Sequence, residues 1–72
     1  MKHYNYNKEY TARGYIITRT TTYSGIPAKD SKVYFNGYHN GRAVWIVDFT
    51  QARAYTEATA NRKIVFLRET QE

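Results

Sequence analysis

The sequence predicts an α+β domain in which an antiparallel sheet of three or four strands carries a C-terminal helix packed on one face. Two observations support this prediction. Before residue 48 the chain is rich in β-branched and aromatic residues that are interrupted by turn signals, as in antiparallel strands. After residue 56 one set of residues recurs at helical spacing: Ala60, Ile64, Leu67 and Gln71. With 72 residues, the chain is expected to form one small domain, 1–72.

The N-terminal stretch HYNYNKEY places Tyr4, Tyr6 and Tyr10 at even positions. In an extended chain the three rings would share one face, because strand side chains alternate. That face has two interpretations, and the sequence leaves both open. The rings could belong to a flexible segment, 1–12, that contacts a partner. Alternatively, the segment could add a first strand to the sheet and pack Tyr4 and Tyr6 over the following hairpin.

The next strand is predicted over RGYIITRTTTY, from Arg13 to Tyr23, because this stretch is dense in β-branched and aromatic residues. The stretch SGIPAKDS follows and contains Gly25, Pro27 and Asp30, a composition typical of a connecting loop. We expect an irregular loop there.

A hairpin is predicted over KVYFNGYHNGRAVWIVDF, which contains two Asn-Gly turn signals. A turn at Asn40-Gly41 is preferred over one at Asn36-Gly37, because it uses the apolar residues better. The resulting pairs are Phe35 with Ile46, Gly37 with Val44, and Tyr34 with Val47. One face then carries Val33, Phe35, Val44 and Ile46 and is the predicted core face, on which the helix packs. The other face, which carries Tyr34, Tyr38, Trp45 and Val47, is predicted to be half covered.

The C-terminal third has two interpretations. Asp48, with Gln51 in capping-box position, could begin one helix that is followed by a strand over KIVFLRE. Alternatively, Thr56-Glu57 could begin a helix that runs to the end of the chain, although Ile64 to Phe66 are β-branched or aromatic. We prefer the C-terminal helix.

The stretch NGRAVWIVDFTQARAYTEATANRKI resembles a pattern found in small phage and prophage accessory proteins. In the pattern, a Trp-containing strand is followed by an acidic residue, a short turn, an aromatic-Thr pair, here Tyr55-Thr56, and a basic amphipathic helix. Some anti-CRISPR proteins are similar in size and plan. The resemblance implies that this chain inhibits a host complex, acting in the host cytoplasm.

Charge and composition favour an anionic partner. Lys and Arg outnumber Asp and Glu by 11 to 6, which gives a net charge of +5 and a pI near 9.6. The first twenty residues contain several charges and no apolar run, so we expect neither a signal peptide nor a membrane span. The absence of cysteine favours a reducing, cytoplasmic environment.

No catalytic or metal-binding pattern is visible. His3 and His39 are placed where no carboxylate would orient them, and Asp48 is better explained as a cap than as a catalyst. Phosphate-binding loops, zinc spacings and Ser-His pairings are missing from the sequence. We therefore predict a protein that is not an enzyme and has no cofactor or metal.

Binding is the remaining class of function. Tyrosine and arginine are typical interface anchors, and aromatic rings beside cations are typical of nucleic-acid surfaces. The predicted partner-binding residues are Tyr4, Tyr6, Lys8, Tyr10, Arg13, Arg19, Tyr34, Tyr38 and Arg42. Trp45 is a further aromatic that could stack on bases. The predicted partner is a host protein or nucleoprotein complex, the alternative is a basic module that binds nucleic acid directly, and the chain itself is expected to be a monomer or a homodimer.

Overall fold

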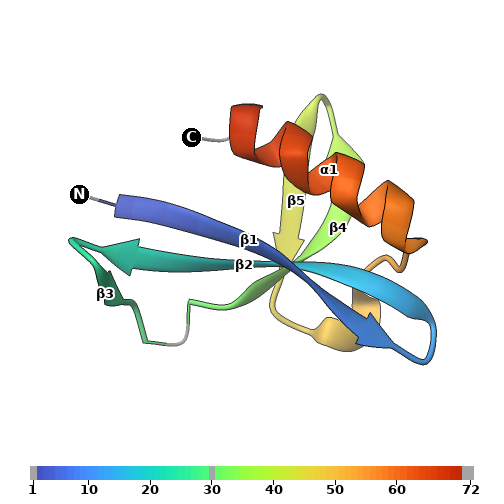
Figure 1. Ribbon diagram of the computed structural model, residues 1–72, viewed down its shortest axis with the longest axis horizontal. Helices are drawn as coiled ribbons and strands as arrows, with labels where there is room; N and C mark the ends of the chain where they lie inside the picture. Colours follow the sequence, from blue (N-terminus) through green and yellow to red (C-terminus); the bar gives the residue numbers. More distant parts are fainter. Residues whose placement is uncertain (1, 30, 71–72) are drawn as a thin grey trace.

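The computed structural model describes residues 2–29 and 31–70. The strands are β1 (Lys2–Thr11), β2 (Gly14–Tyr23), β3 (Ile26–Pro27), β4 (Val33–His39) and β5 (Arg42–Ile46). A 3₁₀ turn, η1 (Phe49–Gln51), and the helix α1 (Glu57–Thr70) follow, which confirms the predicted α+β class (Figure 1). All strand pairs are antiparallel, in the order β1-β2-β4-β5, and β3 pairs with β2. Asp30 and Gln71, which were assigned to the loop and to the helix face, lie outside the described residues.

The longest feature is the β1–β2 hairpin, in which pairing runs from Lys2 opposite Tyr23 to Thr11 opposite Gly14. Residues Lys2–Thr11 therefore form a first strand of the sheet, as in the second interpretation of the tyrosine-rich segment. Near the turn, Tyr15 and Tyr55 exchange two backbone hydrogen bonds of 2.8 Å. Gly14 has φ +127°, and a Cβ there would lie 3.0 Å from the Tyr55 carbonyl oxygen, so only glycine suits this close approach.

The second hairpin turns at Asn40-Gly41, as predicted, with φ values of 52° and 78°. Next to the turn, Tyr38 lies opposite Ala43 in the predicted register. Farther away, Phe35 lies opposite Trp45 and Tyr34 opposite Ile46, so the predicted pairs Phe35–Ile46 and Tyr34–Val47 are wrong by one residue.

A β-bulge between Phe35 and Tyr38 causes this shift. Gly37, with φ +88°, adopts the left-handed backbone that the bulge requires, and the predicted Gly37–Val44 pair falls within it. The bulge brings Trp45 and Tyr38 to the side of Phe35, at ring-centroid distances of 5.5 and 5.2 Å. The predicted core face is therefore correct for Phe35 and wrong for Val44 and Ile46.

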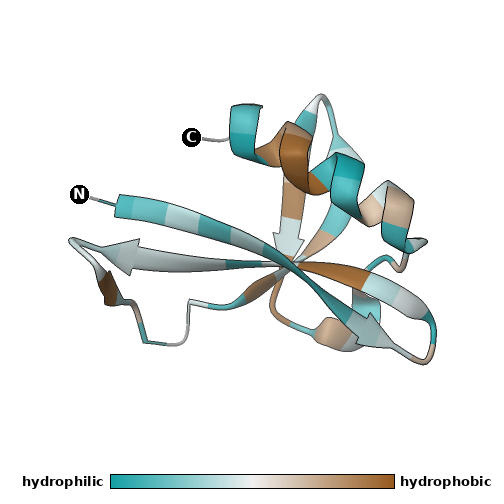
Figure 2. Ribbon diagram, viewed as in Figure 1, coloured by the Kyte–Doolittle hydropathy of each residue, from teal (hydrophilic) through white to brown (hydrophobic). Residues whose placement is uncertain are grey.

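Helix α1 lies over β1 and β2 (Figure 1), and its buried residues are Ala60, Ile64 and Leu67. Figure 2 shows that hydrophobic residues also lie on the outer side of the helix, where Val65 and Phe66 are half exposed. The buried cluster joins residues of both layers: Tyr6, Ile17, Phe35, Ala60, Ile64 and Leu67. Thr56 caps the helix, since its hydroxyl accepts a hydrogen bond from the Thr59 N–H at 3.3 Å. The preferred C-terminal helix is confirmed, because packing of its apolar face outweighs the β-branched residues in its middle.

The stretch that follows β5 forms a short turn and no longer helix. Asp48 accepts hydrogen bonds from the N–H and the hydroxyl of Thr50, at 3.0 and 2.7 Å, and so caps η1. These hydrogen bonds hold the pKa of Asp48 below its ordinary value. Within residues 2–29 and 31–70, no helix is long and apolar enough to cross a membrane.

Candidate binding surface

Arg19 is held between two aromatic rings on the helix-bearing side of the sheet. Its guanidinium carbon lies 4.4 Å from the centroid of the Tyr4 ring and 4.6 Å from that of Trp45. Both neighbours follow from the fold. Arg19 lies opposite Tyr6 in the β1–β2 ladder, so it shares a face with Tyr4, and the bulge turns Trp45 to the same side. We call Lys2, Tyr4, Arg19 and Trp45 the Arg19 cluster.

The Arg19 cluster carries positive charge that is not neutralised by any carboxylate of the described residues. Among the described residues, ion pairs join Lys8 to Glu57 and Lys32 to Glu9, and Arg19 takes part in none. Arg19 Nε and Trp45 Nε1 are buried without a hydrogen-bond partner among the described atoms. A guanidinium fixed by two rings loses little conformational freedom when an anion binds it.

A second cation, on Lys2, lies at the end of the Arg19 cluster. Its Nζ is 5.0 Å from the centroid of the Tyr4 ring. A hydrogen bond between Lys2 and Tyr4 lowers the pKa of the Tyr4 hydroxyl, with smaller contributions from the charges of Lys2 and Arg19 and with burial acting against them. In Figure 1 this end of the β1–β2 hairpin extends past the end of α1, so the helix leaves it uncovered.

A second aromatic surface lies between α1 and the β4–β5 hairpin. The rings of Tyr38 and Phe66 pack edge to face at 6.3 Å, although the two residues are 42% and 52% exposed. Lys63 Nζ lies 5.8 Å from the centroid of the Tyr38 ring, and Arg62 completes the rim. The groove between them has a volume of about 380 Å³. Partial burial raises the pKa of Tyr38.

Tyr6 requires a correction, because it was predicted to contact a partner. Its side chain is 1% exposed and packs in the core with Phe35 of β4 and Leu67 of α1. The ring is therefore part of the core and not of an exposed binding surface. The alternation of tyrosines correctly placed it on one face of β1, but alternation alone does not reveal which part of a face a helix covers.

The other predicted residues on β1 and its turn differ in their environments. Lys8 donates a hydrogen bond of 2.7 Å to Asn61 Oδ1 and pairs with Glu57 at 3.0 Å. Tyr10 is 77% exposed. Arg13 donates hydrogen bonds to the carbonyls of Ala52 and Phe49, at 3.0 and 3.1 Å, so its guanidinium ties the turn to η1.

The predicted residues therefore do not form one continuous surface. Tyr4 and Arg19 come together, and Tyr38 belongs to the second aromatic surface. Tyr34 packs on Phe49 at 6.2 Å, and Arg42 is exposed at the β4–β5 turn. Phe66 and Lys63 were not predicted as binding residues, although an apolar residue off the buried stripe of an amphipathic helix is a usable signal.

Metal-binding groups do not gather in the described part of the chain, where no three His, Asp or Glu side chains are placed to hold a metal ion. The fold and the two surfaces define a small, basic α+β domain in which cations are displayed on aromatic rings. No protein-family model, curated protein or solved structure matches this chain.

Proposed function

We propose that this chain is a non-catalytic phage or mobile-element protein that binds and inhibits a nucleoprotein complex of its host, as anti-CRISPR inhibitors do. The Arg19 cluster is the observation that supports binding to such a target. It offers a cation that pairs with no carboxylate among the described residues and is fixed between two rings, on a protein of net charge +5. The phage origin and the inhibitory role rest on the resemblance of the C-terminal half.

An anionic target would gain two kinds of contact at the Arg19 cluster. Phosphate or carboxylate oxygens accept hydrogen bonds from a guanidinium, and such charge-assisted bonds are roughly twice as strong as neutral ones. The Tyr4 and Trp45 rings add contact area with few rotatable bonds, which is why tyrosine and tryptophan are enriched in binding hot spots. A nucleoprotein complex presents both phosphate and protein groups to such a surface.

The runner-up function is direct binding of nucleic acid, and one feature of the Arg19 cluster favours it. Lys2 and Arg19 flank the Tyr4 ring, at 5.0 and 4.4 Å from its centroid. Cations that follow a phosphate backbone beside rings that stack on bases are typical of single-stranded nucleic-acid sites.

Inhibition can be tested by expressing the chain in hosts that carry an active CRISPR defence and measuring the plating efficiency of a targeted phage. We expect the wild-type chain to raise plating and Arg19→Glu to abolish the rise, because the substitution reverses the charge between the rings. Lys29→Glu makes the same charge change at an exposed position outside the Arg19 cluster and should behave as wild type. Unchanged plating across the defence types would refute the inhibitory role.

Direct nucleic-acid binding is separated by titrating the purified protein with labelled single-stranded and duplex DNA and RNA at low and physiological salt. Micromolar binding that survives physiological salt and is lost in Arg19→Glu would favour the runner-up. Inhibition of the defence without such binding would assign the target to the protein part of the host complex.

A further inference from the structure

Strand β1 forms one edge of the sheet, and no described strand pairs with its outer side. The strand order begins with β1, whose neighbour within the sheet is β2. The backbone hydrogen bonds outside the regular ladders include none that joins β1 to another described segment. An edge strand of this length is a template for strand addition unless the protein blocks it.

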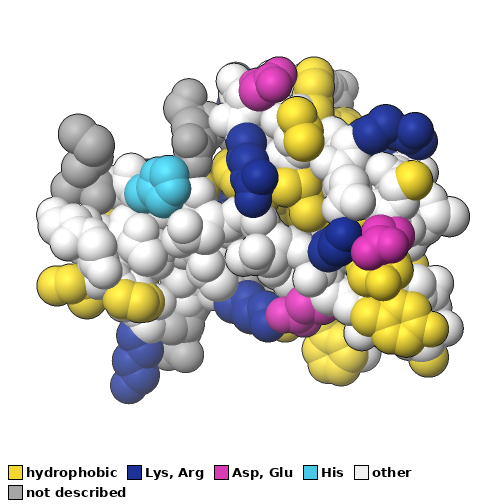
Figure 3. Space-filling model, in the orientation of Figure 1, with side chains coloured by type: hydrophobic (Ala, Val, Ile, Leu, Met, Phe, Trp, Pro, Cys, Tyr) yellow, Lys and Arg dark blue, Asp and Glu magenta, His cyan; other side chains and the backbone are white. Residues whose placement is uncertain are grey.

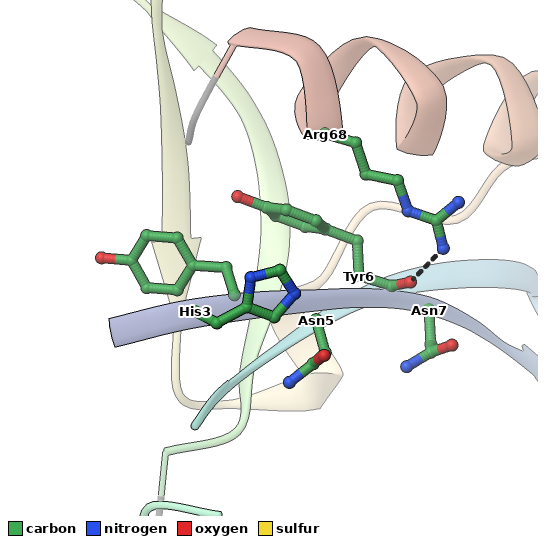
Figure 4. A pocket seen from close by; sticks show the side chains of 6 residues that line it. His3, Asn5, Tyr6, Asn7 and Arg68 are labelled. Atoms are coloured by element: carbon green, nitrogen blue, oxygen red, sulfur yellow. Dashed lines mark hydrogen bonds between the residues drawn. The ribbon is translucent and has the colours of Figure 1, made fainter. Parts of the chain in front are cut away.

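The hairpin register identifies which backbone groups point outward. The two-residue turn makes Thr11 and Gly14 the closing, hydrogen-bonded pair, and hydrogen-bonded pairs then alternate along the ladder. The N–H and C=O groups of Tyr4 and Lys8 consequently face away from β2. Arg68 Nη2 supports this assignment, since it donates to the outward carbonyl of Tyr6 at 3.3 Å (Figure 4).

Helix α1 lies beside this edge and contacts β1. Two adjoining hollows of about 260 and 310 Å³ follow β1, and Tyr6, Asn7 and Arg68 line both. The second hollow also has an apolar part at Ile64 and Val65. Figure 4 shows Arg68 reaching from the helix to the strand, with Asn5 and Asn7 on the opposite side of β1 from the Tyr6 ring. We call this feature the edge groove.

The charges at the edge groove favour an acidic partner. Arg68 lines both hollows and Lys8 lines the second, where Glu57 neutralises it. In the described chain no carboxylate pairs with Arg68, whose guanidinium bonds a neutral carbonyl. A second copy that added its own β1 here would bring like charges together, which opposes self-association. An acidic strand would instead meet opposite charges.

We propose that the edge groove binds an extended acidic segment of a partner protein, which pairs with β1 as an additional strand. The backbone groups of Tyr4 and Lys8 hydrogen-bond to the incoming strand. A carboxylate of that strand accepts a hydrogen bond from Arg68 in place of the Tyr6 carbonyl. An apolar side chain of the strand packs on Val65, which is 52% exposed. The edge groove adjoins the Arg19 cluster at Tyr4, whose backbone faces the groove and whose ring contacts Arg19. The proposal stands without the inhibitory role.

The test uses the full chain and a labelled hexapeptide of alternating glutamate and valine, with a lysine–valine hexapeptide as its matched control. In low-salt anisotropy titrations, we expect the acidic peptide to bind at least about tenfold more tightly than the basic one. Hydrogen exchange at the Tyr4 and Lys8 amides should slow when the acidic peptide is bound.

A matched pair of variants then tests strand addition itself. Lys8→Pro removes an outward N–H and no ladder bond, whereas Lys8→Ala removes the side chain and keeps that N–H. We expect Lys8→Pro to bind the acidic peptide about tenfold more weakly than Lys8→Ala does. If circular dichroism shows that Lys8→Pro is unfolded, Arg68→Glu replaces it and should shift the preference toward the basic peptide.

Three results would overturn the proposal. Equal binding of the two peptides would rule out charge complementarity as the basis of binding. Unchanged hydrogen exchange at the Tyr4 and Lys8 amides would rule out strand addition. Protection of these amides in a concentration-dependent dimer, measured by light scattering without peptide, would assign the edge groove to a second copy.

Discussion

Two parts of the same hairpin are stabilised in different ways. Tyr6 and Tyr10 lie on one strand and on one face of it, yet Tyr6 is 1% exposed and Tyr10 is 77% exposed. The difference comes from α1, whose buried residues pack in one cluster with Tyr6, whereas Tyr10 lies outside that cluster. The comparison teaches that residue type and strand periodicity assign a side chain to a face, whereas burial depends on the element that lies above it.

The turn end is held by polar contacts as well as by the packing of Tyr10 on Tyr15, whose ring centroids are 5.3 Å apart. Arg13 donates to the carbonyls of Ala52 and Phe49, and Tyr15 pairs with Tyr55 through two backbone hydrogen bonds. Hydrogen bonds near solvent contribute less to stability than burial of a large ring does. Substitutions in the two parts should therefore differ in size and in their dependence on pH.

The largest effect is expected in the covered part. Tyr6→Ala should lower the free energy of unfolding by about 3–5 kcal/mol, because it removes a ring from the core and leaves a cavity. Tyr10→Ala should lower it by about 0.5 kcal/mol or less, since that ring is exposed. Urea unfolding of both variants measures the difference, and Tyr6→Leu provides a milder core change if Tyr6→Ala does not fold. Equal unfolding midpoints for the two alanine variants would contradict the comparison.

An intermediate effect is expected at the turn end. Arg13→Ala should lower the free energy of unfolding by about 1 kcal/mol, because it removes two charge-assisted hydrogen bonds that water partly replaces. Arg42→Ala is the matched control, since Arg42 begins β5 beside the other hairpin turn and makes no ion pair or side-chain hydrogen bond with the described residues. Urea titrations of both variants measure the effect, and a cost at Arg42 as large as that at Arg13 would argue against a tie between the turn and η1.

The smallest effect is expected at Asp48 and should depend on pH. Hydrogen bonds from Thr50 lower the pKa of Asp48 in the folded state below its ordinary value of 3.8. Its contribution is therefore present above the ordinary pKa and is lost as pH falls through the lowered one. Asp48→Asn should be slightly less stable than wild type near pH 7, and the difference should shrink as the pH falls from about 5 to about 2. Unfolding midpoints measured across this range test the sign, and a difference that grows in acid would contradict it.

Much of the fold could be predicted from local patterns in the sequence. The strand over Arg13 to Tyr23, the Asn40-Gly41 turn and the helix after Tyr55 follow from propensity, turn chemistry and helical spacing, all of which act over a few residues. The binding residues were harder to predict. Tyr4 and Arg19 do come together, but Tyr6 enters the core, and Arg13 bonds the backbone of a segment far along the chain.

The sequence by itself therefore determined the fold class, the turn between β4 and β5, the C-terminal helix and the excess of positive charge, because each depends on composition or on neighbouring residues. Tertiary structure decided the rest. The bulge at Gly37 turns Trp45 toward Arg19, and α1 covers Tyr6 while it leaves Tyr10 exposed. These outcomes depend on contacts between segments distant in the sequence. The free energy of packing two such segments cannot be deduced from the residue pattern of either segment alone.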